Sequence, residues 1–290
     1  MVPTLVYFDQ NAYDYLLDHC YSADSVKNAI RRRKYELIIS GHNFQEWAAC
    51  WKSGNLEKEA RGQALLGYLH ALDPDRLLLE IPDLLRYEVA KLFGRRLPGP
   101  WLPEEDVANA KALITRFACG EPTAADRRNI ARNWRDKESI RDLQHEIAAT
   151  RGSRRKMIKE TFEAFVAANR AEAERIGRIV LADALEGSAM DRKRDEVKFA
   201  LKRWKKCPTL VAAIRVNLFI YRAVKGGTKL RHDYWDDLKH CINAAYADVF
   251  VTGDKKLAEM FLGIRPGPTI ASTEDFFYEL GLSSCTPSSR

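Results

Sequence analysis

Residues 4–11 read Thr-Leu-Val-Tyr-Phe-Asp-Gln-Asn, a short apolar and aromatic run that ends abruptly in three polar side chains. Such a run is typical of a buried strand with a polar tip. Residues 25–34 have the pattern of a helix, and residues 36–40 form a second apolar run. A strand, a helix and another strand in this order predict a right-handed parallel unit.

Further strand and helix patterns extend this alternation at both ends of the chain. Strands are expected at residues 76–81, 249–252 and 269–271, and helices at residues 56–72, 209–224 and 235–246, with a last helix that ends near residue 280. We therefore predict an α/β fold, in which a parallel sheet is flanked by helices in a three-layer arrangement.

The middle of the chain is dominated by helical patterns after Pro98, Pro100 and Pro103. The expected helices span residues 107–119, 124–150, 155–185 and 192–206. Glycines and prolines separate these patterns, as they do at helix ends. We expect residues 96–207 to form a basic helical insertion between the two parts of the α/β domain, residues 1–95 and 208–290.

The composition is that of an ordinary globular protein. Of the 290 residues, 46% are hydrophobic and 30% are charged, unlike disordered or collagen-like chains. No apolar stretch approaches the roughly 20 residues that span a membrane, and no secretory signal is visible, so we expect a cytoplasmic protein without a membrane partner. The six cysteines lie far apart without a CxxC pair, which predicts free, buried thiols and no structural zinc site.

The net charge of +7 is concentrated in two parts of the chain. Residues 127–159 hold eleven Lys and Arg against four Asp and Glu, and residues 191–206 hold eight against three. Clustered cations gain affinity for phosphate by releasing counterions, so this asymmetry predicts a nucleic acid as partner. Solvated helix faces are the alternative. The candidate contact residues are Arg127, Arg128, Arg154, Arg155 and Lys156.

Several predicted strands are followed by an acidic residue, and another acid lies on the helix before residues 249–252. The four candidates are Asp9, Glu46, Asp237 and Asp254. Parallel sheets place their ligand sites at the carboxyl ends of the strands. Carboxylates gathered there repel one another unless a cation lies between them. Oxygen ligands suit Mg²⁺ or Mn²⁺, so these acids predict a divalent metal site that activates water.

Four segments resemble, in order, the motifs of PIN-domain nucleases. They are residues 6–11 (VYFDQN), 43–47 (NFQEW), 237–245 (DLKHCINAA) and 248–257 (DVFVTGDKKL). The last two are the most specific, because the 17 positions from Asp237 to Asp254 leave room for one helix and one strand. The resemblance covers about residues 1–95 and 210–290, and it does not extend to the helical middle.

The PIN resemblance implies a metal-dependent endonuclease that acts on RNA more often than on DNA. It makes Asp9, Glu46, Asp237 and Asp254 the metal-binding acids. Second-tier residues are Asn11, a polar neighbour, Thr252, a hydroxyl beside the metal or its water, and Asp236, an alternative to Asp237. Helical spacing favours Asp237, which shares a face with residues 241, 244 and 245. An inhibitor protein or a second copy of the chain is a further candidate partner.

Some of these residues also have a purely structural interpretation. Asp9 at a strand tip can cap the following helix. Glu88 is a second-tier acid for which a helix surface is the favoured position. His240 follows Asp237 by three residues, and a packed or hydrogen-bonded histidine is favoured there over a general base.

Two other functions compete with the nuclease. The first is a phosphohydrolase of the haloacid dehalogenase type, with Asp9 as nucleophile and Asp254 as Mg²⁺ ligand. That chemistry usually has a second aspartate two positions after the first, where this chain has Asn11. The second is a non-catalytic protein that binds nucleic acid or another partner and keeps the scaffold without cleaving.

Overall fold

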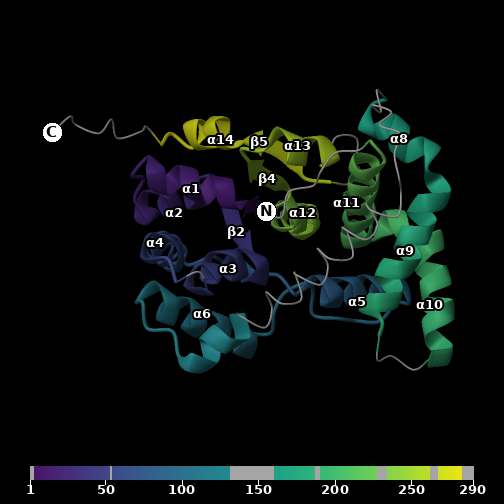
Figure 1. Cartoon of the computed structure of the whole chain (residues 1–290), viewed down its shortest axis with the longest axis horizontal. Helices are drawn as coiled ribbons and strands as arrows, with labels where there is room; N and C mark the ends of the chain where they lie inside the picture. The colour runs from purple at the N-terminus through teal and green to yellow at the C-terminus, as the bar shows by residue number, and fades with distance from the viewer. Residues whose placement is uncertain are drawn as a thin grey trace.

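The computed structural model describes residues 3–52, 54–130, 160–186, 190–226, 234–261 and 267–282. At its centre is a sheet of five parallel strands in the order β3-β2-β1-β4-β5 (Figure 1). The strands are β1 (Thr4–Phe8), β2 (Tyr35–Ile39), β3 (Arg76–Leu77), β4 (Val249–Thr252) and β5 (Thr269–Ser272). The predicted parallel sheet is therefore confirmed.

β1 marks the point where the strand order reverses. The chain fills one side of β1 with β2 and β3, and then places β4 and β5 on the other side. Phe8, the last residue of β1, is aligned with Val251 of β4. Sheets of this kind bind ligands in the crevice beyond the carboxyl ends of the strands at this reversal. Side chains that directly follow β1 and β4 therefore occupy the favoured position for a site.

The alternation of side chains along β1 divides the core into two parts. Val6 and Phe8 belong to one buried cluster and Tyr7 to the other, since successive strand residues point to opposite faces. Helices that contribute to the first cluster are α1 (Gln10–Asp18), α2 (Ala23–Arg32), α3 (Gly41–Ala48), α4 (Leu56–Leu72) and α14 (Thr273–Glu279). Those of the second are α5 (Ile81–Leu92), α11 (Pro208–Lys225), α12 (Tyr234–Asn243) and α13 (Lys255–Phe261). This is the predicted three-layer α/β fold.

Helices of the predicted insertion extend both helical layers. α6 (Glu104–Ala118) packs against α4 and places Ile114 and Phe117 in the first cluster. α8 (Phe162–Ala168), α9 (Arg170–Ala184) and α10 (Met190–Lys202) contribute to the second cluster, beside α5 and α11. Figure 1 shows α6 next to α3 and α4, and α8 to α10 beyond α11. Most of the buried apolar residues described in this region therefore belong to the two clusters that cover the sheet.

Several boundaries differ from those expected. β3 ends at Leu77, because Leu78 and Leu79 pair instead with the segment at Pro100 and Trp101, and α5 then begins at Ile81. The sequence indicates a helix after Asp9 and a helix that carries Glu88 without giving their bounds, and the structure has them as α1 and α5. The single helix expected over residues 155–185 is two helices, α8 and α9, divided at Asn169. The Asn169 amide donates to the Phe165 carbonyl, which is the local competition with the backbone that interrupts helices.

Two further features of the fold are the state of the cysteines and the character of the long helices. Cys207 and Cys241 are free and buried as predicted, whereas Cys20 and Cys119 are free but exposed. Across the described ranges, no helix combines the length and the apolar character that crossing a bilayer requires.

Candidate functional site

Asp9 lies at the carboxyl end of β1, where the strand order reverses. Its Oδ1 accepts a hydrogen bond of 2.9 Å from the amide of Ala12, and its Oδ2 accepts one of 2.5 Å from the hydroxyl of Thr252. Asp9 therefore caps α1, as the structural interpretation expects, and also joins the ends of β1 and β4. Only 1% of its surface is exposed.

The carboxyl group of Asp9 is costly to ionise in this position. Burial raises its pKa to about 6, although the Thr252 hydrogen bond and the charge of His240 act in the opposite direction. The nearby charge of Glu46 raises the pKa further. A buried carboxylate beside another carboxylate is a position where positive charge is stabilising.

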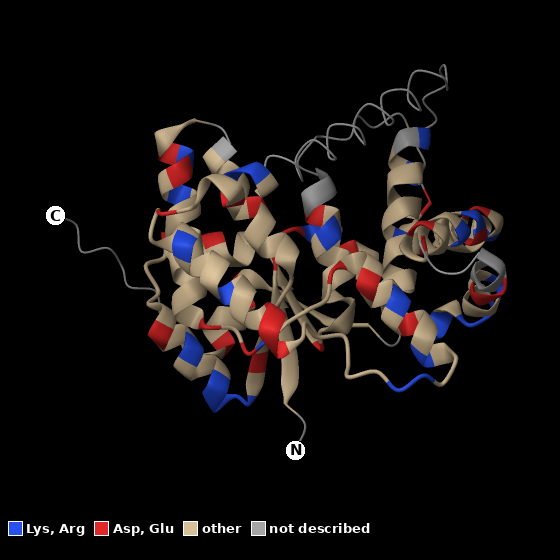
Figure 2. Ribbon diagram, turned by 90° about the horizontal axis from the view of Figure 1, so that it is seen from below, with Lys and Arg blue, Asp and Glu red and all other residues tan. Residues whose placement is uncertain are grey.

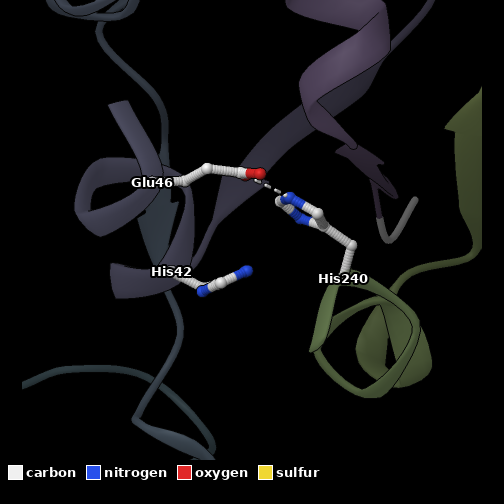
Figure 3. Close-up of side chains that lie close together, drawn as sticks. All are labelled: His42, Glu46 and His240. Atoms are coloured by element: carbon white, nitrogen blue, oxygen red, sulfur yellow. Dashed lines mark hydrogen bonds and ion pairs between the residues drawn. The ribbon is translucent and has the colours of Figure 1, made fainter. Parts of the chain in front are cut away.

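Glu46 lies on α3 (Gly41–Ala48), the helix that follows β2. Its Oε2 lies 2.9 Å from Nε2 of His240 on α12, a contact between residues 194 positions apart. Figure 3 shows the two side chains pointing toward one another. The amide of Gln10 also reaches both oxygens of Glu46 when its nitrogen faces the carboxylate. Glu46 is thus held from two sides.

His240 is the hydrogen-bonded histidine that the sequence favours. It is 1% exposed, and its Nδ1 lies 2.8 Å from the hydroxyl of Tyr7 on β1. Burial alone would lower its pKa. The hydrogen bond and charge of Glu46, together with Asp9 and Asp237, outweigh burial and raise the pKa of His240 above its ordinary value.

His42 completes a group that the sequence analysis missed. One ligand atom each from His42, Glu46 and His240 lie within 4.8 Å of one another, which among the described residues is the one such group of three. His42 is 4% exposed and precedes Glu46 by four residues, so both project from one face of α3. The H-x-x-x-E spacing of His42 and Glu46 was visible in the sequence. The packing of His240 against these two residues was not.

The four predicted acids are neighbours without forming one tight cluster. As a set they do not come within the 4.8 Å that joins His42, Glu46 and His240 in the part of the chain described. Asp9, Asp237 and Asp254 nevertheless all lie close enough to Cys241 that, after burial, their charges raise the pKa of this thiol. Three of the four therefore act electrostatically on one buried side chain of α12.

The remaining residues at this edge occupy varied positions. Asp254 follows β4, and its amide donates a 3.0 Å hydrogen bond to the Thr252 hydroxyl, which thus links Asp9 and Asp254. Asn11 is exposed on α1. Asp236 lies on α12, with its side chain outside the described part of the structure.

Glu88 is not on a helix surface, and that expectation was wrong. It is 3% exposed and accepts hydrogen bonds of 2.6 and 3.2 Å from the amides of Thr209 and Leu210 in the first turn of α11. The Tyr246 hydroxyl donates a third bond of 3.0 Å. Burial raises the pKa of Glu88 to about 7. Its contacts are those of a buried helix cap, since a carboxylate satisfies amides at a helix N-terminus.

The predicted basic contact residues are only partly described. Arg127 and Arg128 are exposed on a helical segment, residues 124–130. Arg154, Arg155 and Lys156 lie outside the described residues. Figure 2 shows Lys and Arg interspersed with Asp and Glu along many of the helices.

Comparison of the chain with models of known families, with curated proteins and with solved structures finds no match. The assignment of function therefore depends on the geometry of the site.

Proposed function

We propose that the protein is a metal-dependent endonuclease that hydrolyses phosphodiester bonds, with RNA as the preferred substrate. Asp9, Glu46, Asp237 and Asp254 are the proposed metal ligands. One observation carries the proposal: Asp9 and Thr252 meet through a 2.5 Å hydrogen bond at the carboxyl ends of β1 and β4, where the strand order reverses. This is the position at which open parallel sheets bind their ligands.

The donors at this edge suit a hard divalent cation. Each oxygen of Asp9 accepts one hydrogen bond from the protein, which leaves lone pairs for an ion. Burial and the neighbouring Glu46 carboxylate disfavour a negative charge at Asp9, and a divalent cation would reverse that cost. Oxygen donors favour Mg²⁺ or Mn²⁺. When bound, such an ion supplies an activated water and stabilises the charge that develops on the phosphate.

The side chains around the acids would keep the site in one arrangement. Thr252 and the Ala12 amide hold the Asp9 carboxylate from both sides. His240 and Gln10 orient Glu46. Ligands held in this way lose little conformational freedom on binding, so the order already present favours binding of an ion.

The choice of nucleic acid as substrate rests on the charge pattern and on the PIN resemblance. Exposed Arg127 and Arg128 belong to the most basic part of the chain, and clustered cations bind phosphates by releasing counterions. The preference for RNA over DNA comes from the resemblance alone.

A cleavage assay tests the proposal. Wild-type protein is incubated with end-labelled single-stranded RNA or DNA in Mg²⁺, in Mn²⁺ or in excess EDTA. We expect RNA cleavage that EDTA abolishes, and a loss of at least about a hundredfold in Asp9→Asn, because metal-assisted hydrolysis depends on its ligands. Asp24→Asn, which changes an exposed acid on α2, is the matched control and should cleave like the wild type.

The other outcomes separate the competing functions. Equal cleavage by Asp9→Asn and wild type would refute the site. RNA binding that EDTA does not affect, without cleavage, would favour the non-catalytic alternative. A phospho-aspartate trapped at Asp9 would favour the phosphohydrolase.

A further inference from the structure

We propose that His42, Glu46 and His240 form a binding site for a divalent transition-metal ion, with Zn²⁺ as the probe. This site uses two imidazoles and one carboxylate, unlike the oxygen-only site proposed above, with which it shares Glu46. The inference goes beyond the nuclease proposal, because it concerns metal binding and stands whether or not the chain cleaves RNA.

The three side chains already converge on one point. Figure 3 shows His42 and Glu46 projecting from α3 toward His240 on α12. The Glu46 and His240 atoms are 2.9 Å apart, and one atom of each residue lies within a span of 4.8 Å. Zinc–ligand bonds of about 2.0–2.2 Å place neighbouring ligand atoms roughly 3.4 Å apart. Small side-chain movements therefore suffice to bind one ion.

A buried hydrogen-bond chain indicates which nitrogen of His240 carries the hydrogen when Nε2 faces Glu46. The Asn43 amide donates to the carbonyl of Phe8 and accepts from the amide of Ser40, so backbone groups fix its orientation. The Ser40 hydroxyl donates to the Asn43 oxygen at 3.2 Å. Ser40 then accepts from the Tyr7 hydroxyl, which lies 3.1 Å away.

The same chain continues from Tyr7 to His240. With its hydrogen directed at Ser40, the Tyr7 oxygen accepts from Nδ1–H of His240. With the hydrogens placed in this way, each hydrogen bond from Asn43 through Ser40 and Tyr7 to His240 has one donor and one acceptor. The lone pair of Nε2 then faces the Glu46 carboxylate at 2.9 Å, an arrangement that a positive centre between the two atoms stabilises. A metal ion bound by both atoms is such a centre.

This arrangement resembles the support that proteins give to metal-binding histidines. A ligating histidine usually donates its other ring N–H to an oxygen, which fixes the tautomer and the ring orientation. Tyr7 supplies that oxygen here, on a residue fully buried in the central strand. Both histidines are buried, whereas the Glu46 side chain is 15% exposed, so this ligand of the group contacts solvent.

The donor set selects the class of metal. Imidazole nitrogen is a poor ligand for Mg²⁺ and a good one for Zn²⁺ and its neighbours in the periodic table. Two histidines and one glutamate also leave a coordination position open for water. The negative charges of Asp9 and Asp237, which already act on His240, favour any cation at this point.

Metal titration of the full-length protein tests the inference. Chelator-treated protein is titrated with Zn²⁺ in the presence of excess Mg²⁺, by calorimetry or by competition with a zinc indicator. We expect one tight Zn²⁺ per chain that Mg²⁺ does not displace. His42→Ala and Glu46→Gln should each weaken binding by at least about tenfold. His70→Ala removes an exposed histidine at the end of α4 and should leave the affinity unchanged.

X-ray absorption of the bound zinc provides a readout that does not depend on the variants. Nitrogen and oxygen neighbours without sulfur are expected, since the exposed cysteines are the competing ligands. The inference is overturned by sulfur ligands, or by wild-type affinity in His42→Ala. Zinc binding without RNA cleavage would contradict the nuclease proposal alone, and Mg²⁺-dependent cleavage without zinc binding would contradict this inference alone.

Discussion

At the scale of single residues, Thr252 is the link between the two strand ends of the candidate site. Its hydroxyl donates to Asp9 and accepts from the amide of Asp254. Thr252 is 4% exposed and Asp9 is 1% exposed, so neither can replace this bond with water. One hydroxyl thus determines how two of the proposed ligands lie relative to each other.

Replacing Thr252 by valine should destabilise the protein. The substitution keeps the shape but leaves a buried carboxylate oxygen without its donor, which costs about 1–3 kcal/mol. The pKa of Asp9 should rise, because the Thr252 bond is one of the interactions that lower it. Chemical denaturation in EDTA measures the free energy of unfolding. Thr252→Ser keeps the hydroxyl and should retain most of the stability, and equal losses in both variants would contradict this account.

Glu88 should make stability depend on pH. Its folded-state pKa of about 7 lies above the ordinary value of 4.5, so the folded protein binds a proton that the unfolded chain has lost. This contribution is fully present below about pH 4.5 and is lost as the pH rises through 7. The total change is on the order of 3 kcal/mol.

Urea denaturation of wild type and Glu88→Gln at pH 5 and pH 8 measures this dependence. Because other groups titrate in both proteins, the informative quantity is the difference between them in the free energy of unfolding. That difference should move in favour of the variant as the pH rises. A difference that does not change with pH would show that Glu88 titrates normally.

At the scale of the elements, the site depends on how closely α3 lies against α4. Gly62 of α4 is the residue at this contact: a Cβ atom there would lie 2.7 Å from the carbonyl oxygen of Trp47 and 3.0 Å from the Cβ of Cys50. The Trp47 carbonyl oxygen is a backbone atom, so it cannot move aside by the rotation of a side chain. The position of α3, which carries His42 and Glu46, therefore requires glycine at this point of α4.

Gly62→Ala should destabilise the protein by about 1–3 kcal/mol, because one added carbon is forced into a packed contact. Gly67 lies on the same helix with open space at its Cβ position. Gly67→Ala should instead stabilise by up to about 1 kcal/mol, since alanine has the higher helix propensity. Thermal and urea denaturation compare the two variants. Similar shifts of the same sign would mean that the α3–α4 contact imposes no constraint.

At the scale of the whole molecule, the sheet has two different edges. The proposed ligands gather at its carboxyl edge, whereas Arg31 and Arg32 end α2 just before β2 starts, at the opposite edge. Both of these arginines are exposed, as are Arg127 and Arg128. The same charge reversal can therefore be made at Arg127 and Arg128 and, for comparison, at Arg31 and Arg32.

The double variant Arg127→Glu, Arg128→Glu should bind RNA more weakly and with a flatter dependence on salt. Each phosphate contact that is lost lowers the slope of log affinity against log salt by about 0.7–0.9. Binding measured at several salt concentrations by fluorescence anisotropy gives the slope. The control Arg31→Glu, Arg32→Glu should change it less. An equal slope in both variants would remove residues 127 and 128 from the binding surface.

The sequence predicted most of the fold because it depends on local patterns. The apolar runs at residues 4–8 and 249–252 are strands with the expected bounds, and α4 spans residues 56–72 as predicted. The positions of Asp9 and Asp254 just after strands follow from the same patterns. Where the expectations differed, as at Asn169, one side chain competes with the helix backbone in a way that periodicity does not show.

The contacts between distant elements required the folded structure. Glu88 has the sequence context of a helix surface, yet it is buried because α11 places its first amides against it. His42 and His240 belong to helices far apart in the chain, and they meet because α3 and α12 pack over one edge of the sheet. Periodicity encodes which face of an element is apolar. It does not encode which polar side chains meet across an interface, since that depends on the packing of all the layers together.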